Sequence, residues 1–130
     1  MELKLKEAEQ VINSELTSKI QKSLINFDEL LIETTSEDLI QVILFLKSND
    51  KLKFRQLIDI AAVDYPEEEK RFKLIYLLLS HEMNTRIKIS INLEIGKKVP
   101  TITKVYPSAN WMEREVFDMY GIEFSDNPDL

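Results

Sequence analysis

Residues 71–94 read RFKLIYLLLSHEMNTRIKISINLE, and this stretch decides the fold. Over Thr85–Glu94, isoleucine and leucine alternate strictly with polar residues, which is typical of a strand with one buried and one solvated face. Arg71–Ser80 forms the strand before it and contains an unbroken apolar run, Leu74–Leu79, so we expect both faces of that strand to be covered. The short polar connection His81–Asn84 predicts that the two strands form an antiparallel hairpin.

The chain before this hairpin predicts a helix followed by further strands. Apolar residues recur at helical spacing over Leu3–Ile20, which predicts an amphipathic helix, either continuous or broken near Asn13-Ser14. Over Leu24–Thr34 the apolar residues are spaced as in one or two strands, and Asp28-Glu29 is expected at a bend.

A second helix is predicted from its N-terminal cap. Thr35-Ser36-Glu37-Asp38 supplies hydroxyl and acidic side chains that satisfy free N–H groups and complement the helix dipole, and the helix then extends to about Lys47. We expect a short helical turn near Phe54–Leu57 and a strand at Ile58–Val63. The charged segment Glu67–Lys70 is typical of a solvated loop.

Downstream of the hairpin, Thr101–Val105 predicts a short strand, and the last helix follows it. Ser108 or Asn110 can cap this helix, and Asn110 with Glu113 has the spacing of a capping box. Gly121 stands where a left-handed C-cap is expected. The chain therefore predicts a single α+β domain with a mostly antiparallel sheet and with helices packed on one face.

Composition narrows the function. The 130 residues give room for one core, and 17 basic against 23 acidic residues leave a net charge of −6. Lysine and arginine are scattered, which disfavours a nucleic-acid surface. Cysteine is absent and His81 is the single histidine, so the sequence offers no thiolate-ligated iron–sulfur cluster and no histidine-rich metal centre.

Location is also expected from composition. No stretch approaches the roughly 20 apolar residues that a membrane span requires. The charged start, Met1–Glu7, lacks the apolar core of a secretion signal. We therefore expect a cytoplasmic protein without a membrane span of its own.

Charged and aromatic residues crowd into the last predicted helix. Arg114 and Asp118 can pair one turn apart, for about 0.3–0.5 kcal/mol if exposed. One mainly apolar stripe is expected to pack against the domain, while the remainder is aromatic and charged. Helical spacing gives three stripes: Trp111, Arg114, Glu115 and Asp118; Met112, Val116 and Met119; Glu113, Phe117 and Tyr120.

Three interpretations of this helix follow from the residues alone. It is a solvated face with local ion pairs, a protein interface anchored by aromatic residues beside arginine, or an acid–base site formed by Glu113 and Glu115. The third is disfavoured, because residues two apart on a helix point about 200° apart and such carboxylates cannot easily converge on one bond. Without a glycine-rich phosphate loop or a nucleophile motif, no other site is predicted.

The run Glu113–Phe124, EREVFDMYGIEF, resembles the Glu-Arg-Glu-x-aromatic-Asp-x-aromatic-Gly-Ile-x-Phe signature of the C subunit of respiratory complex I and of the related subunits of membrane-bound hydrogenases. Ile60–Pro66, Arg71–Ser80 and Tyr106–Trp111 resemble further segments of the same family. The resemblance thus extends over most of the chain from about Leu30 onward.

Two departures from the family pattern stand out. Asp126 and Asn127 occupy the positions where the family has Gly and His, and the chain ends at Leu130, before the family's basic pair. Residues 1–130 are therefore expected to be a domain like the complex I C subunit, either truncated at its C-terminus or a short member of the family.

The resemblance implies a non-catalytic structural subunit in the peripheral arm of a proton-translocating NADH:quinone oxidoreductase. It implies that the chain braces the quinone-site subunit and the iron–sulfur subunits on the cytoplasmic side of the cell membrane. The complex would use NADH, FMN, iron–sulfur clusters and quinone through other subunits, while this chain would bind no cofactor or metal and hold no catalytic residue.

Two alternatives remain: the equivalent subunit of a hydrogenase- or other donor-linked complex, and a free-standing protein-interaction domain. The candidate interface or family-motif residues are Trp111, Glu113, Arg114, Glu115, Phe117, Asp118, Tyr120, Gly121 and Phe124.

Overall fold

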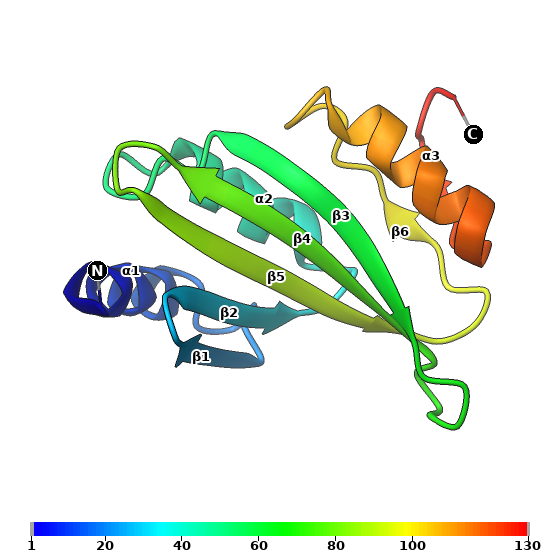
Figure 1. The fold of residues 1–130 in the computed structure, drawn as a ribbon, viewed down its shortest axis with the longest axis horizontal. Coiled ribbons are helices and arrows are strands. Elements are labelled where there is room, and N and C mark those ends of the chain that lie inside the picture. Colours follow the sequence, from blue (N-terminus) through cyan, green and yellow to red (C-terminus); the bar gives the residue numbers. More distant parts are fainter. Residues whose placement is uncertain (1, 130) are drawn as a thin grey trace.

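The computed structural model describes residues 2–129; Met1 and Leu130, the two ends of the chain, lie outside the described residues. Within this range the chain alternates helices with short groups of strands (Figure 1). In chain order the elements are α1 (Glu2–Glu15), β1 (Lys22–Asn26), β2 (Glu29–Thr34), α2 (Leu39–Ser48), β3 (Gln56–Asp64), β4 (Phe72–Ser80), β5 (Thr85–Leu93), β6 (Val99–Pro100), α3 (Ala109–Tyr120) and β7 (Phe124–Ser125).

Five strands form one sheet in the order β1-β2-β5-β4-β3. Neighbouring strands run antiparallel except β2 and β5, which are parallel. The predicted hairpin is β4–β5, and it lies inside the sheet with Tyr76 opposite Ile89. The α+β class and the mostly antiparallel sheet are confirmed.

One face of the sheet carries the hydrophobic core. The alternating residues of β5, Ile87, Ile89, Ile91 and Leu93, are buried as predicted, because their side chains all point to this face. α2 lies behind the sheet in Figure 1, and α1 packs against β1 and β2. α3 lies along the edge strand β3. The opposite face of the sheet is open in this view.

The prediction that both faces of Leu74–Leu79 are covered is wrong within the described chain. Leu74, Tyr76 and Leu78 are buried, but the alternating side chains on the open face, such as Leu77, are only half-buried. The apolar run therefore belongs to a strand, β4, of which only one face is covered by other residues in the range 2–129.

The predicted hairpin bend near Asp28-Glu29 is confirmed, since β1 and β2 are joined by a turn at Phe27-Asp28. The first helix is shorter than predicted and ends at Glu15, near the expected break. The Ser14 hydroxyl donates to the Val11 carbonyl at 3.0 Å and the Thr17 hydroxyl to the Asn13 carbonyl at 2.5 Å. Such bonds compete with the helix for its last carbonyl groups.

The predicted cap of the second helix lies directly before α2. Asp38 is the N-cap residue, but its side chain makes no cap bond, and the first turn of α2 contains no acidic residue, so this part of the prediction is wrong. The Thr35 hydroxyl instead accepts the backbone N–H of Asp38 at 3.3 Å, before the helix begins. The expected helical turn at Phe54–Leu57 is wrong. The turn lies earlier, with the Lys53 N–H on the Asn49 carbonyl at 3.0 Å, because Phe54 is buried in extended backbone that leads directly into β3.

The strand expected at Thr101–Val105 is also displaced. β6 covers only Val99–Pro100 and pairs in parallel with β7, a strand that the sequence did not indicate. The Thr101 N–H still bonds to the Ser125 carbonyl, but the next N–H, that of Ile102, bonds to the Glu113 carboxylate. The backbone then turns, with the Val105 N–H on the Ile102 carbonyl at 3.0 Å. β6 and β7 thus close the chain into a small second sheet beside α3 (Figure 1).

Candidate docking surface on the C-terminal helix

Glu113 is the buried centre of the last helix and has no exposed surface. Its carboxylate accepts hydrogen bonds from the Thr101 hydroxyl at 2.5 Å, the Ile102 N–H at 2.9 Å and the Asn127 amide at 2.8 Å. A buried carboxylate is stable only with such donors. Glu113 therefore ties α3 to the loop before it and to the tail after it.

Asn127, which departs from the family pattern in sequence, has a structural part here. Its amide donates to Glu113, and its own Oδ1 accepts the Asp129 N–H at 2.8 Å. An amide at this position holds the tail against the helix by hydrogen bonding to the buried carboxylate.

The two ends of α3 were only half predicted. Ser108 is the N-cap residue but makes no side-chain cap bond. The expected capping box of Asn110 and Glu113 is wrong, because the Glu113 carboxylate bonds inward and the Asn110 amide donates to Asp129. The left-handed C-cap at Gly121 is confirmed, with φ of 73° and its N–H on the Phe117 carbonyl at 2.8 Å.

The C-terminal end of α3 meets the end of the β3–β4 hairpin where the connecting loop begins and ends. The Tyr120 ring lies edge-on to Phe72, with the ring centroids 6.1 Å apart. Arg71 donates to both oxygens of Asp64 at 2.6 and 2.8 Å and lies 5.5 Å from the Phe72 ring centroid. These hydrogen bonds hold the pKa of the Asp64 carboxyl below its ordinary value. Segments that resembled the family separately in sequence meet here in space.

The loop before α3 is fixed to the helix layer. The Tyr106 hydroxyl donates to the Phe54 carbonyl, and the Lys47 ammonium donates to the Val105 carbonyl at 2.6 Å. The same ammonium lies 5.3 Å from the centroid of the Tyr106 ring. Burial raises the pKa of Tyr106, so its hydroxyl stays a hydrogen-bond donor.

The outer side of α3 faces solvent as predicted. Trp111, Arg114, Glu115 and Asp118 are exposed, and Trp111 retains 66% of its surface. Glu113 and Glu115 therefore point to opposite sides, as the helical spacing predicted. The five ion pairs found within residues 2–129 do not include one between Arg114 and Asp118.

The predicted apolar stripe is partly wrong. Val116 is buried and Met112 is half-buried, but Met119 is 75% exposed. Met119 lies at the exposed edge of the helix, while the next residue, Tyr120, packs against the core and Glu113 occupies a further inner position. The structure thus divides the candidate residues into three sets: buried Glu113 and Phe124; half-buried Phe117 and Tyr120; exposed Trp111, Arg114, Glu115, Asp118 and Gly121.

Residues on β3 join this surface, and the sequence patterns did not indicate them. A hollow of about 210 Å³ lies between β3 and α3 and is lined by Asp59, Ala61 and Met119 among others. In the sequence, the feature that pointed to this hollow was the lone carboxylate of Asp59 inside the otherwise apolar run Leu57–Val63.

No helix within residues 2–129 is long and apolar enough to cross a membrane. The same range holds no cluster of three or more potential metal ligands.

The fold and this surface define a small α+β domain. Its C-terminal helix is anchored by the buried Glu113 carboxylate and exposes aromatic, sulfur-containing and charged side chains to solvent. Residues 32–130 match the family described as respiratory-chain NADH dehydrogenase, 30 kDa subunit. The chain belongs to this family, and the resemblance seen in the motif is confirmed.

Named relatives agree with this assignment. The chain is 42% identical over 128 residues to the C subunit of the NADH-quinone oxidoreductase of Ruegeria pomeroyi, and the match covers 98% of this chain and 60% of that protein. It is 46% identical over 101 residues to the protein of the same name from Wolbachia sp. subsp. Brugia malayi, with 78% of this chain and 53% of that one covered. The chain thus spans about 60% of the length of the curated relatives it matches first.

Solved structures share the fold. A trypsin-resistant fragment (1–134) of Nqo5 superposes with a TM-score of 0.79 at 25% identity, over 95% of this chain and 98% of that one. A chain of the membrane-bound sulfane sulfur reductase, an archaeal respiratory membrane complex, superposes with a TM-score of 0.77 at 23% identity, over 93% and 72% respectively.

Proposed function

We propose that the chain is a structural part of the peripheral arm of a proton-translocating NADH:quinone oxidoreductase. It braces the quinone-site subunit and the iron–sulfur subunits, and it lies on the cytoplasmic side of the cell membrane. The observation that carries this proposal is the match of residues 32–130 to the 30 kDa subunit family, together with 42% identity to a relative named for NADH-quinone oxidoreductase.

In this proposal the chain takes no part in electron transfer by itself. Other subunits bind NADH, FMN, the iron–sulfur clusters and quinone, and this chain fixes the distances between them. The division of α3 supports a bracing role, because Glu113 holds the helix rigidly from inside while Trp111 and Met119 stay exposed. Exposed large side chains on a rigid element are typical anchors of a protein interface.

A second candidate keeps the fold and changes the electron donor. The similarity to a chain of an archaeal sulfane sulfur reductase shows that this fold also occurs in a respiratory complex of another name. At 23% identity that similarity concerns the fold alone. The relatives with the quinone oxidoreductase name are nearly twice as similar in sequence, so we prefer the NADH-linked complex.

The test is purification of the complex through an affinity tag on this chain. The expected result is that the quinone-site and iron–sulfur subunits elute with it and that deletion of the gene abolishes NADH:quinone activity in membranes. Elution with a hydrogenase or with no respiratory subunit would contradict the proposal. Glu115→Ala combined with Asp118→Ala is expected to reduce retention of the chain, because both carboxylates lie on the exposed side of α3.

A further inference from the structure

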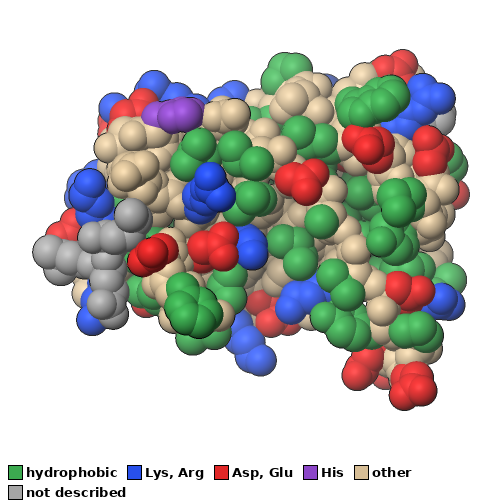
Figure 2. Space-filling view, viewed as in Figure 1, with side chains coloured by type: hydrophobic (Ala, Val, Ile, Leu, Met, Phe, Trp, Pro, Cys, Tyr) green, Lys and Arg blue, Asp and Glu red, His purple; other side chains and the backbone are tan. Residues whose placement is uncertain are grey.

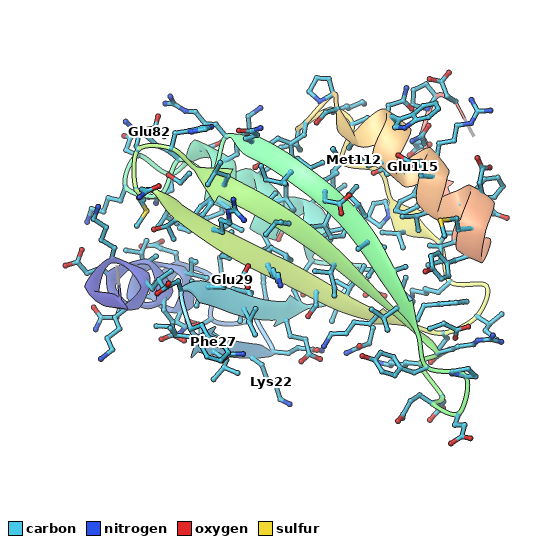
Figure 3. All side chains as sticks on the ribbon, viewed as in Figure 1. Lys22, Phe27, Glu29, Glu82, Met112 and Glu115 are labelled. Carbon is cyan, nitrogen blue, oxygen red and sulfur yellow. The ribbon has the colours of Figure 1, made fainter. Side chains whose placement is uncertain are left out.

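The hollow between β3 and α3 is a groove with walls from two elements. Ala61 and Ala62 of β3 form one wall, and Met112, Glu115 and Met119 of α3 form the other. Figure 3 shows Met112 and Glu115 on the part of α3 beside β3. The groove lies at the edge of the sheet, where α3 runs along β3 (Figure 1).

Below its charged rim, the walls and the floor of the groove are apolar and adaptable. The two alanines contribute only methyl groups, and Val116 closes the floor with 4% of its surface exposed. Met112 and Met119 add flexible thioether chains, which fit apolar groups of varied shape. In the space-filling view, apolar side chains gather over α3 and β3, with carboxylates between them (Figure 2). This floor suits one apolar side chain of a partner.

The rim of the groove is acidic. Asp59 on β3 and Glu115 on α3 are exposed, and no lysine or arginine of the described chain lines the groove. Elsewhere within residues 2–129 several carboxylates are paired, such as Asp64 with Arg71. Neither rim carboxylate belongs to any ion pair or side-chain hydrogen bond found in this range.

A β-bulge places Asp59 at this rim. Leu57 lies opposite Leu78 and Asp59 opposite Leu77, so Ile58 is an extra residue in β3. A bulge of this kind shifts the alternation of side chains by one position and reorients them. Without it Asp59 would point to the buried face, where an unpaired carboxylate is costly. The bulge turns its carboxylate toward the open side next to α3.

We propose that this groove, here called the β3–α3 groove, receives a segment of a neighbouring subunit in which an apolar side chain is flanked by lysine or arginine. The apolar side chain enters between Ala61 and Met112, and the flanking cations pair with Asp59 and Glu115. The negative charge of the rim favours binding of a basic segment over a neutral or acidic one. This inference rests on the proposed function, because it requires a neighbouring subunit of the complex.

The first test removes each charge without changing shape. Asp59→Asn and Glu115→Gln are introduced into the tagged chain in cells, and the complex is washed with increasing salt. Each variant is expected to release the neighbouring subunits about two- to fivefold more readily, as for loss of one ion pair at the edge of an interface. Asp28→Asn, which changes an exposed carboxylate outside every ion pair found in residues 2–129, serves as the control and is expected to behave as the unchanged chain.

The second test identifies the occupant. Photo-methionine is incorporated into the complex in place of methionine, and the peptides linked to Met112 and Met119 are sequenced after illumination. The expected partner is a peptide of another subunit with lysine or arginine within two positions of the linked apolar residue. Links to a second copy of this chain, or to a segment without a basic residue, would overturn the inference.

The two proposals fail in different ways. If the unchanged chain elutes without respiratory subunits, the proposed function is wrong and the groove inference is overturned with it. If the complex elutes intact but Asp59→Asn and Glu115→Gln resist salt as the control does, only the groove inference is overturned.

Discussion

The carboxylate of Glu113 accepts the backbone N–H of Ile102 at 2.9 Å inside the protein, across eleven residues of chain. The bond joins the C-terminal helix to the loop that precedes it. The Glu113 carboxylate also accepts hydrogen bonds from the Thr101 hydroxyl and the Asn127 amide. One side chain therefore connects α3, the loop before it and the tail after it. The exposed side of α3 is therefore presented on a helix that cannot easily shift against the sheet.

Glu113→Ala is expected to lower the free energy of unfolding by about 3 kcal/mol, because the substitution removes the acceptor of the buried Ile102 N–H and of the Asn127 amide. Urea denaturation of the isolated chain measures this change. Glu115→Ala, two residues along the same helix but exposed, is the matched control and is expected to change stability by less than about 0.5 kcal/mol. Equal effects of the two substitutions would contradict a structural role for Glu113.

Tyr76→Phe is expected to leave the stability of the chain unchanged or to raise it by up to about 1 kcal/mol. Tyr76 is fully buried and its hydroxyl has no hydrogen-bond partner among the described residues. Burial and the nearby charge of Glu113 raise the pKa of this phenol well above its ordinary value, so the hydroxyl stays neutral. Thermal unfolding provides the measurement, and a clear loss of stability would show that the hydroxyl has a partner in solution.

Gly121→Ala is expected to cost about 1 kcal/mol in stability, because the residue adopts the left-handed conformation at the end of α3. A Cβ at this position meets no atom within 4 Å, so the cost comes from the backbone alone. Gly121→Asn is the comparison and is expected to cost less, since asparagine tolerates this conformation better. A larger loss for asparagine than for alanine in urea denaturation would refute this assignment.

The pKa of Glu37 is expected to fall to about 2 in the folded chain, from an ordinary value of 4.5, because Lys97 donates a hydrogen bond to its carboxylate. A depressed folded-state pKa means that the pair stabilises the fold fully above pH 4.5 and that this contribution is lost as the pH falls toward 2. Both side chains are about half exposed, so the contribution is small. Carboxyl-carbon NMR follows the titration, and Lys97→Met should return the midpoint toward 4.5. An unchanged midpoint would contradict the pairing.

Local patterns were sufficient for much of the fold. The strict alternation over Ile87–Leu93 predicted one buried face, since side-chain direction in a strand depends only on neighbouring residues. Gly121 was predictable for the same reason, because a left-handed helix end requires a residue without Cβ strain. The unbroken apolar run Leu74–Leu79 was misleading, since apolar composition does not state whether a cover lies on the second face.

Contacts between distant segments were not predictable. The strand expected at Thr101–Val105 does not form, because the Ile102 N–H bonds to the carboxylate of Glu113, which lies further along the chain, and Val105 bonds back to Ile102 in a turn. Met119 was assigned to the core by its spacing, but the inner side of α3 is formed by Glu113, Val116 and Tyr120. The β3–α3 groove depends on the bulge at Ile58. A bulge is defined by the register between two paired strands, so it could not be predicted from the sequence of β3 alone.

The exposed side of α3 can be followed directly through Met119, which retains 75% of its surface. Its rate of oxidation to the sulfoxide by dilute hydrogen peroxide is measured by mass spectrometry in the isolated chain and in the purified complex, with the half-buried Met83 as internal reference. If α3 is the docking helix of the peripheral arm, Met119 oxidises quickly in the isolated chain and several-fold more slowly in the complex. Equal rates for Met119 in the two samples would contradict a docking role for this helix.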